Sequence, residues 1–267
     1  MKIKYGKHIT DIRAAFFDID GTYFDQVHGQ IPPANIDAVR RLQENGFKVA
    51  LASARPYSTT MEVEGINSIQ WDGLVCAGGQ QVYDAQKRLL YEDFFSRETL
   101  HEIFDITQLN QIPVYAVGTQ TFYTMWNTCT AEFHRRFHLP DIPVRSYQGE
   151  SIQLITLIME KGFHYEPYFE KLPDVAITYS GDTNTDLFPA GVTKATGIHQ
   201  LMMLWGFPIH DYLCFGDTRT DIPMLEDACL GIAMGNAEKE VMLHADAVCA
   251  CSDCNGIPNF LRDCFLI

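Results

Sequence analysis

The segment AAFFDI, from Ala14 to Ile19, is an apolar run that ends in an acidic loop. Such a run is typical of a strand buried in a parallel sheet, because helices cover both of its faces. A helical pattern, PPANIDAVRRLQENGF, follows it. Two further apolar runs, KVALAS and DGLVCAGG, come next, with another helical stretch between them. This βαβαβ alternation predicts a doubly wound, Rossmann-like α/β sheet, whose sites lie at the carboxyl ends of the strands.

The pattern changes between residues 83 and 187. Strand-like pieces such as VYAVGTQTFYTMW and SIQLITLIME are interleaved there with helical ones such as RETLHEIFDITQL and TAEFHRRFH. From residue 188 onward, apolar runs such as DYLCFGD and LGIAMGN again alternate with short helical patterns. We therefore expect a core of residues 1–82 and 188–267 and an inserted α+β domain of residues 83–187.

The composition narrows the range of partners. A formal net charge of −14 argues against a nucleic-acid binder and against an anionic membrane surface as partner, because both interactions need a basic face. The sequence has no uncharged apolar run of roughly 18 residues. Its basic start, MKIKYGKHIT, is not followed by the apolar segment of a signal peptide. We expect a cytoplasmic protein that is a monomer or small homo-oligomer, and the composition still allows a local positive site for a small anion.

The eight cysteines show no framework typical of a secreted protein, so reduced thiols are the simpler interpretation. Cys249, Cys251, Cys254 and Cys264 cluster near the end of the sequence. Their spacing matches no usual zinc pattern. We therefore interpret them as small buried side chains and loop thiols, and a metal site is the alternative.

Two similar hexamers, GDTNTD from Gly181 and GDTRTD from Gly216, each offer acidic residues that could hold a cation. The second follows the continuous apolar run YLCF and precedes a helical pattern, which predicts the end of a core strand. The first follows the alternating run VAITYS within the insert. We therefore expect Asp182 and Asp186 on a loop or strand edge of the insert, and only the second copy in a site.

Four pieces of sequence are predicted to end core strands and to converge in one crevice. The residues with chemical roles in them are Asp18, Asp20, Ser53, Lys194, Asp217 and Asp221. The carboxylates of Asp18, Asp20 and Asp217 together suit a hard cation such as Mg²⁺, and without one their mutual repulsion is costly. A serine hydroxyl and a lysine ammonium suit the oxygens of a phosphoryl group.

The segments FFDIDGTYFD, LASARP, GVTKATGI and FGDTRTDIPML resemble the four motifs of the haloacid dehalogenase superfamily of phosphohydrolases. The split core with its long insert resembles the Cof-like branch, which contains sugar-phosphate and cofactor phosphatases. The resemblance implies a Mg²⁺-dependent enzyme that cleaves phosphate monoesters of small metabolites. It implies that Asp18 attacks phosphorus to form an aspartyl-phosphate, and that Asp20 protonates the leaving group and then activates water.

The same resemblance assigns the binding residues. Ser53 and Lys194 would hold the phosphoryl group, and Asp18, Asp217 and the main-chain carbonyl of Asp20 would hold Mg²⁺. Asp221 would support either the water molecules of the metal or Lys194. Arg55, after Ser53, would contact substrate or form a structural ion pair, and the sequence leaves both possibilities open.

Two positions depart from the pattern of the family. Thr220 stands where the family usually has asparagine, and we expect this shorter group to lie on the phosphate side of the site. Gly78 and Gly79 replace the usual Asn-Gly pair, which removes a side-chain amide near the phosphate. Because these departures affect phosphate positioning, two alternatives stay open. One is a phosphomutase or phosphotransferase, and the other is a non-catalytic phosphometabolite sensor.

The resemblance also implies that the insert is a mobile cap that closes over the core, excludes water and selects the leaving group. Aromatic residues of the insert could line such a closed pocket, although packing within the insert is the commoner explanation. They are Tyr115, Phe122, Tyr123 and Trp126. His134 and His138 lie four residues apart in a helical pattern, which more often marks a solvated face than a zinc site.

Overall fold

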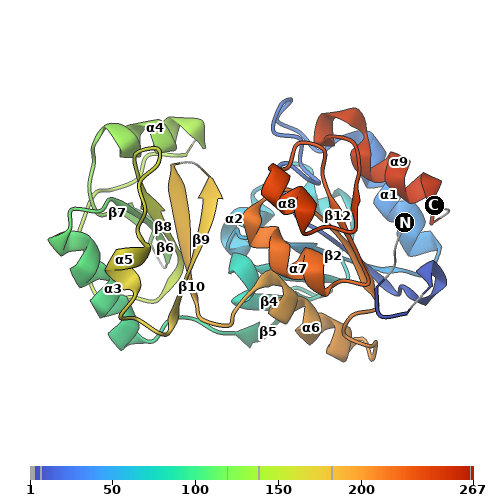
Figure 1. Ribbon diagram of the computed structural model, residues 1–267, viewed down its shortest axis with the longest axis horizontal. Coiled ribbons are helices and arrows are strands. Elements are labelled where there is room, and N and C mark those ends of the chain that lie inside the picture. Colours follow the sequence, from blue (N-terminus) through green and yellow to red (C-terminus); the bar gives the residue numbers. More distant parts are fainter. Residues whose placement is uncertain (1–3, 7, 119, 138, 182, 265) are drawn as a thin grey trace. The chain divides into compact units, whose positions relative to one another are not determined.

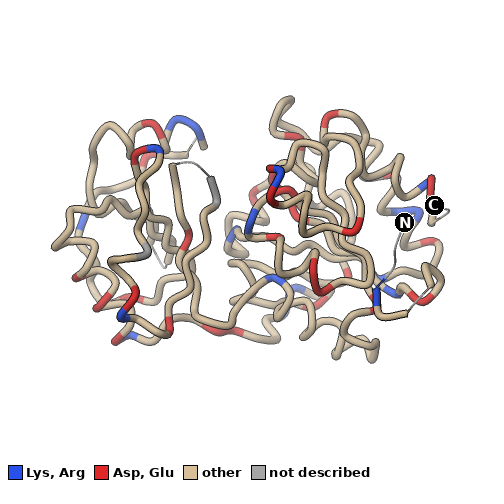
Figure 2. The backbone as a smooth tube through the Cα atoms, in the orientation of Figure 1, with Lys and Arg blue, Asp and Glu red and all other residues tan. Residues whose placement is uncertain are grey.

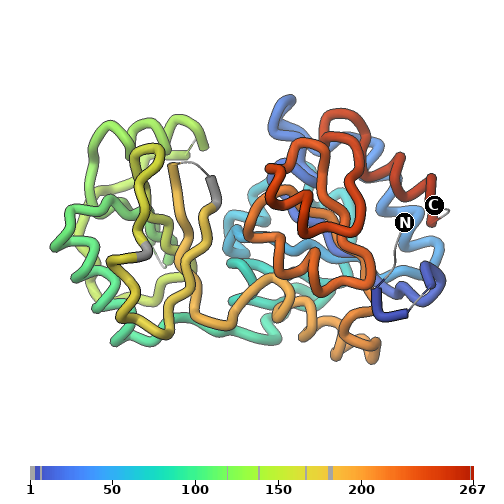
Figure 3. The backbone as a smooth tube through the Cα atoms, in the orientation of Figure 1, coloured from blue at the N-terminus to red at the C-terminus, as the bar shows by residue number. Residues whose placement is uncertain are grey.

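The computed structural model describes residues 4–6, 8–118, 120–137, 139–181, 183–264 and 266–267. The chain divides into two compact units, which we call the core unit (residues 1–92 and 193–267) and the insert unit (residues 93–192). Figure 3 shows that the core unit combines both ends of the chain, blue and orange to red, whereas the insert unit is formed by the middle of the chain.

The described residues of the core unit form an eight-stranded sheet in the order β13-β12-β11-β1-β2-β3-β4-β5. Its strands are β1 (Ala14–Phe17), β2 (Lys48–Ala52), β3 (Gly73–Cys76), β4 (Gln81–Asp84), β5 (Leu89–Glu92), β11 (Tyr212–Gly216), β12 (Leu230–Ala233) and β13 (Ala247–Val248). The strands from β13 to β3 are parallel, and β4 and β5 are antiparallel. The expected doubly wound, mostly parallel sheet is confirmed.

Helices cover both faces of this sheet (Figure 1). They are α1 (Pro33–Glu44), α2 (Tyr57–Met61), α6 (Lys194–Leu204), α7 (Ile222–Asp227), α8 (Lys239–Leu243) and α9 (Gly256–Asp263). Short 3₁₀ turns add η1 (Ile9–Asp11), η2 (Ile66–Ser68), η3 (Ala77–Gly79), η4 (Arg219–Asp221) and η5 (Ser252–Cys254).

The alternating side chains of β1 explain why helices cover both faces of the sheet. Ala15 and Phe17 pack into a hydrophobic cluster with side chains of α1 and α9, whereas Ala14 and Phe16 pack with α6, α7 and α8. Because successive side chains of a strand point to opposite faces, an uninterrupted apolar run has to be covered on both sides.

The described residues of the insert unit form an antiparallel five-stranded sheet in the order β7-β6-β8-β10-β9. Its elements are α3 (Arg97–Leu109), β6 (Val114–Gly118), β7 (Phe122–Tyr123), α4 (Thr128–Arg136), β8 (Ile152–Ile158), α5 (Glu166–Phe169), β9 (Val175–Gly181) and β10 (Asn184–Pro189). Side chains of α3 and α5 pack with one set of strand residues and Phe133 of α4 with another. The expected inserted α+β domain is confirmed as a fold.

The boundaries of the two units differ from the expected 82/83 and 187/188. They lie at 92/93 and 192/193, because β4 pairs with β3 and β5 with β4, which makes this hairpin part of the core sheet. At the other end, β10 continues to Pro189 in register with β9, so these residues stay with the insert. Strand pairing set both boundaries, and the local sequence pattern did not reveal it.

The first hexamer, GDTNTD, spans the connection from β9 to β10. Asp182 lies outside the described residues. The expected loop or strand-edge position is wrong for Asp186, because β10 lies between β8 and β9 and Asp186 is buried. The Thr156 hydroxyl donates a hydrogen bond to Asp186 Oδ1 at 2.6 Å, which satisfies this carboxylate inside the sheet.

The aromatic residues of the insert mostly pack inside it. Tyr115, Phe122 and Tyr123 are buried in its hydrophobic clusters, as the packing interpretation predicted, whereas Trp126 is 49% exposed. His134 Nδ1 lies 3.3 Å from the Tyr123 hydroxyl, and His138 lies outside the described residues.

Lysine and arginine are interspersed with aspartate and glutamate in both units (Figure 2). None of the helices in the described part of the chain combines the length and apolar composition needed to cross a membrane.

Candidate active site

The site is built on three neighbouring parallel strands. Strand β1 pairs with β2 on one side and with β11 on the other. Asp18, Ser53 and Asp217 each directly follow the last residue of one of these strands. Because parallel strands end at the same edge of a sheet, the three side chains come to the same edge, as the sequence predicted.

Lys194 reaches this edge by a different route from the expected one. It does not end a core strand but is the first residue of α6, after the N-cap Thr193. The Thr193 hydroxyl accepts a hydrogen bond from the main-chain N–H of Thr196 at 3.3 Å, and the Thr196 hydroxyl accepts one from the N–H of Thr193 at 2.9 Å. This capping box fixes where the helix begins and therefore where Lys194 lies.

The ammonium group of Lys194 is the central cation of the site. It is buried and donates hydrogen bonds to Asp18 Oδ1 and to Asp221 Oδ1, both at 2.6 Å. Burial alone would lower the pKa of Lys194, but the adjacent carboxylates of Asp18 and Asp221 raise it above its ordinary value. Lys194 therefore carries a charge and joins β1 to the loop after β11.

Asp18 lies in an environment that disfavours its charge. Burial, followed by the proximity of Asp221, raises the pKa of Asp18 from 3.8 to about 7, against the opposing effect of Lys194. A raised pKa at the end of a core strand is typical of a group whose charge is stabilised by a ligand or used in catalysis.

Asp217 has hydrogen-bonding partners that the sequence reasoning missed. The Thr22 hydroxyl donates to Asp217 Oδ1 at 3.1 Å, and the Asn236 amide donates to Asp217 Oδ2 at 3.2 Å. Burial, and then the charges of Asp18 and Asp221, raise the pKa of Asp217 well above its ordinary value. Thr22 lies within the first motif and could have been proposed, whereas Asn236 belongs to the loop after β12 and carries no local signal.

Gly21 is required by this arrangement. It has a φ of +82°, and a Cβ atom at this position would lie 2.2 Å from Asp217 Oδ2. The glycine after the DID sequence therefore lets the loop turn and lets Asp217 approach it closely.

The three carboxylates of Asp18, Asp217 and Asp221 each offer an oxygen atom, and these atoms all lie within 4.8 Å of one another. Lys194 supplies one positive charge against three carboxylates. An all-oxygen donor set with excess negative charge fits a hard divalent cation. The carboxylate of Asp20, which was also considered for the metal, lies outside this group and has a different partner.

That partner is Arg55. Its Nε donates to Asp20 Oδ2 at 2.6 Å and its Nη2 donates to Asp20 Oδ1 at 2.7 Å, which is a bidentate pair. Of the two possibilities left open by the sequence, the structure contains the ion pair. The paired groups are about a third exposed, so the fork fixes the orientation of the Asp20 carboxylate at a position open to solvent.

Asp221 holds the loop that carries Asp217. Its Oδ2 accepts the main-chain N–H groups of Asp217 and Thr218, at 3.0 and 2.9 Å, while its Oδ1 accepts from Lys194. Contact with Lys194, which is one of the two supporting roles expected for Asp221, is present. The Thr220 hydroxyl, expected on the phosphate side, is buried and lies 2.8 Å from the Thr218 hydroxyl.

Ser53 is buried at the end of β2, and its hydroxyl accepts the main-chain N–H of Arg55 at 3.1 Å. This hydrogen bond directs the loop that carries Arg55 and leaves the hydroxyl hydrogen of Ser53 available to donate.

The raised pKa of Asp18 predicts an unusual pH dependence of stability in protein freed of divalent ions. The pKa is 3.8 unfolded and about 7 folded, so the folded state holds this proton where the unfolded state has lost it. The contribution of Asp18 to the free energy of unfolding therefore falls as the pH rises from about 4 to 7. Thermal unfolding of wild type and Asp18→Asn in EDTA measures it. The stability of wild type relative to the variant should fall across this range, and a constant difference would contradict the prediction.

The backbone conformation of Gly79 leads to a second prediction, which concerns stability. It has a φ of +110°, and a Cβ atom there would lie 2.0 Å from the main-chain oxygen of Thr193, next to Lys194. Gly79→Ala should lower the free energy of unfolding by about 1–3 kcal/mol, because the start of α6 has to move. Gly78→Asn is the matched control, since Gly78 has a φ of +66°, a conformation that asparagine tolerates. Equal losses in the two variants, measured by urea unfolding, would be inconsistent with this account.

The cysteine cluster is partly separated. Cys251 and Cys254 lie together with Asp253, with their ligand atoms within 4.8 Å of one another. The thiol of Cys249 is instead 3.5 Å from the sulfur of Met234.

Comparison with known proteins identifies the family of the chain. The profile of the haloacid dehalogenase-like hydrolases matches residues 15–261. A 5-amino-6-(5-phospho-D-ribitylamino)uracil phosphatase of Bacillus subtilis (strain 168), YcsE, is 23% identical over 94% of this chain and 95% of its own length.

Two solved structures extend the comparison. A hypothetical protein from Geobacillus kaustophilus is 30% identical, with a TM-score of 0.81, over 96% of this chain and all of its own. A sugar phosphatase of haloacid dehalogenase subclass IIB has the same fold, with a TM-score of 0.84 at 24% identity, over 96% of this chain and all of its own. The chain therefore belongs to the haloacid dehalogenase-like hydrolases, as a phosphatase of their Cof-like branch.

Proposed function

We propose that this protein is a Mg²⁺-dependent phosphohydrolase that cleaves phosphate monoesters of small phosphorylated metabolites through an aspartyl-phosphate on Asp18. The observation that carries the proposal is the buried Asp18 carboxylate, fixed by Lys194 within a group of three carboxylates at the end of β1. Asp18, Asp217 and the main-chain carbonyl of Asp20 would hold Mg²⁺. When bound, Mg²⁺ favours the ionised carboxylates and offsets the charge of the phosphoryl group.

In the first step, an oxygen of Asp18 attacks phosphorus while Asp20 donates a proton to the leaving oxygen of the ester. The bond to the leaving group breaks as the bond from Asp18 forms, which yields the alcohol and the aspartyl-phosphate. Because Lys194 binds Asp18 Oδ1, the other oxygen of this carboxylate is the one that attacks. Asp20 carries its proton at the start of this step, so it first gives up one of its two hydrogen bonds from Arg55. Arg55 acts as a positioning residue, because the remaining hydrogen bond orients the carboxyl group.

In the second step, Asp20 takes a proton from a water molecule, which attacks phosphorus. Inorganic phosphate leaves, and Asp18 and Asp20 return to their starting states. One acid–base group can serve both steps, because the leaving group departs from the side of phosphorus at which water later enters.

The phosphoryl group would be bound by Lys194, Ser53 and Thr220. The Lys194 ammonium is charged and within reach of Asp18, so it can also approach an oxygen of the group that Asp18 attacks. The Ser53 hydroxyl has a hydrogen to donate, and Thr220 would donate after giving up its contact with Thr218.

The names of relatives support small metabolites as substrates, since one is a phosphatase of a ribitylaminouracil phosphate and another a sugar phosphatase. We propose sugar phosphates or phosphorylated cofactors as the substrate class. We assign the selection of the leaving group to the insert unit, and we propose that the enzyme works in the cytoplasm.

A screen of phosphate release over a panel of phosphorylated sugars and cofactors tests this function. We expect release from a subset of the panel with Mg²⁺, loss of release with EDTA, and recovery when Mg²⁺ is added back. Phosphate transfer to an added sugar instead of water would identify a phosphotransferase. Ligand binding without phosphate release across the whole panel would identify a sensor.

A further inference from the structure

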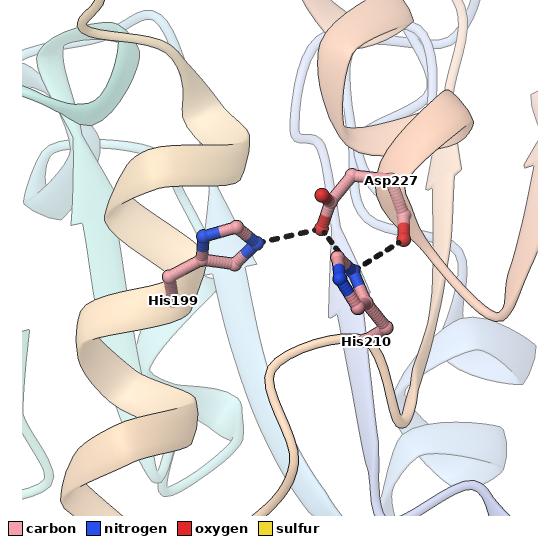
Figure 4. Close-up of side chains that lie close together, drawn as sticks. All are labelled: His199, His210 and Asp227. Atoms are coloured by element: carbon pink, nitrogen blue, oxygen red, sulfur yellow. Dashed lines mark hydrogen bonds and ion pairs between the residues drawn. The ribbon is translucent and has the colours of Figure 1, made fainter.

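A second cluster of side chains with metal-binding capacity lies outside the active site. His199 lies on α6, His210 lies in the loop before β11, and Asp227 is the last residue of α7 (Figure 4). One ligand atom from each residue lies within 4.8 Å of the others. Three separate elements thus bring two imidazoles and one carboxylate to one point.

The carboxylate of Asp227 lies between the two imidazoles. Its Oδ2 is 2.7 Å from His199 Nε2 and 3.3 Å from His210 Nδ1, and dashed lines mark these pairs in Figure 4. Ligands that share one tetrahedral Zn²⁺ at bonds of about 2.0–2.2 Å lie roughly 3.3 Å from one another. The His210 pair already has this separation. The His199 pair, at 2.7 Å, is about 0.6 Å shorter, so His199 would move outward by about this distance to share an ion with Asp227. One nitrogen of each imidazole lies within 4.8 Å of the other, and a shared ion would draw the two rings together.

Neighbouring groups hold the three side chains in place. The buried Tyr212 hydroxyl donates a hydrogen bond to Asp227 Oδ2 at 2.9 Å. The ring of Tyr5 stacks on His210, with 4.5 Å between centroids. His210 Nδ1 also lies 3.1 Å from the main-chain oxygen of Asp227, a hydrogen bond that ligation by this nitrogen would replace. Outer partners of this kind orient ligands and tune metal sites.

The cluster is accessible without being fully exposed. The side chains of His199, His210 and Asp227 are 24%, 35% and 20% exposed, so an ion can enter and a water molecule can occupy the fourth position. An ordinary surface pair differs from this arrangement. His244 Nδ1 lies 2.6 Å from Glu226 Oε1, where one imidazole faces one carboxylate.

We propose that His199, His210 and Asp227 form a binding site for a first-row transition-metal ion such as Zn²⁺, separate from the catalytic carboxylates. Imidazole nitrogens suit Zn²⁺, whereas an all-oxygen set suits Mg²⁺, so the two sites select different ions. The ion links α6 to α7. Helix α6 begins at Lys194, and α7 follows directly after Asp221. The ion therefore also braces the segments next to the buried ion pair of Lys194 and Asp221.

Zn²⁺ titration of untagged protein by calorimetry, in excess Mg²⁺, tests the proposal. A Cys251→Ser, Cys254→Ser background removes the thiols that lie beside Asp253 and could bind zinc themselves. We expect one Zn²⁺ per chain in this background and in its His244→Gln variant. In His199→Gln and in His210→Gln, the dissociation constant should rise at least about 10-fold, since even an outer partner of a ligand is worth about this factor.

Thermal unfolding separates loss of binding from loss of the fold. Zn²⁺ should raise the melting temperature of the background and of His244→Gln, and at the same concentration it should raise that of His199→Gln and His210→Gln by less. Melting curves without Zn²⁺ and phosphate release with Mg²⁺ show whether each variant is folded. Absence of Zn²⁺ binding in the background, or equal affinity in all variants, would overturn the proposal.

Discussion

Replacing Asp18 by asparagine is expected to lower the kcat of phosphate release by on the order of 10⁴-fold or more, because an amide cannot form the aspartyl-phosphate. The loss should not come from unfolding. The amide that the substitution introduces is neutral, whereas burial and Asp221 disfavour the charge of Asp18. Asp221 would still pair with Lys194. Steady-state kinetics on the best substrate of the panel, with urea unfolding at the same pH, measures both effects.

The matched control for this substitution is Asp25→Asn. Asp25 is also a buried acid and is the last residue of the first motif, and it pairs with His28 at 2.5 Å outside the group of three carboxylates. The folded fraction of the Asp25→Asn variant should retain its activity. An Asp18→Asn variant with nearly wild-type kcat would rule out the nucleophile assignment, whatever its stability.

Replacing Lys194 by methionine is expected to lower the free energy of unfolding by about 3–5 kcal/mol and to abolish detectable activity. The substitution leaves Asp18 and Asp221 buried without the ammonium group that both of them contact. The activity falls for a second reason, since the group that faces the phosphoryl oxygens is also lost. Urea unfolding without divalent ions gives the stability effect, and phosphate release with Mg²⁺ gives the activity.

A double-mutant cycle isolates the ion pair. In an Asp18→Asn background, Lys194→Met should cost less stability than in wild type, because one of the two buried carboxylates is already neutral. Equal costs in both backgrounds would mean that Lys194 stabilises the fold through packing alone and would contradict the electrostatic account.

The sequence was sufficient for the parts of the fold that depend on local patterns. The apolar runs before Asp18, Ser53 and Asp217 predicted core strands, and parallel strands necessarily bring their ends to one edge. The placement of these three residues followed from that rule. The sequence allowed an ion pair for Arg55 but did not identify Asp20 as its partner, because the two residues follow different strands.

Other features depended on non-local pairing, and the sequence predicted them poorly. Lys194 was expected at a strand end, although the threonines at positions 193 and 196 were a usable signal for a helix start. Asp186 was expected at an edge, and its partner Thr156 is 30 residues away on β8. Asn236 contacts Asp217 from 19 residues away, in the loop after β12, and no motif marks it.

The boundaries of the insert show the same limit. The hairpin of β4 and β5 belongs to the core sheet only because β4 pairs with β3, and the sequence of β4 alone does not reveal its partner. The cluster of His199, His210 and Asp227 has no regular spacing either. It exists because α6, α7 and the loop before β11 pack together.

We propose that catalysis proceeds through a phosphorylated Asp18. Acid quenching during the first turnover, followed by intact-mass and peptide analysis, tests it directly. Asp20→Asn should prolong the intermediate, because this variant cannot activate water in the second step, and an activated aryl phosphate ester removes the need for an acid in the first. We predict one added phosphoryl group per chain, located on the peptide with Asp18 and absent from Asp18→Asn. Phosphate release without a phosphorylated form of wild type or of Asp20→Asn would contradict this mechanism. A phosphoryl group on another residue would contradict it as well.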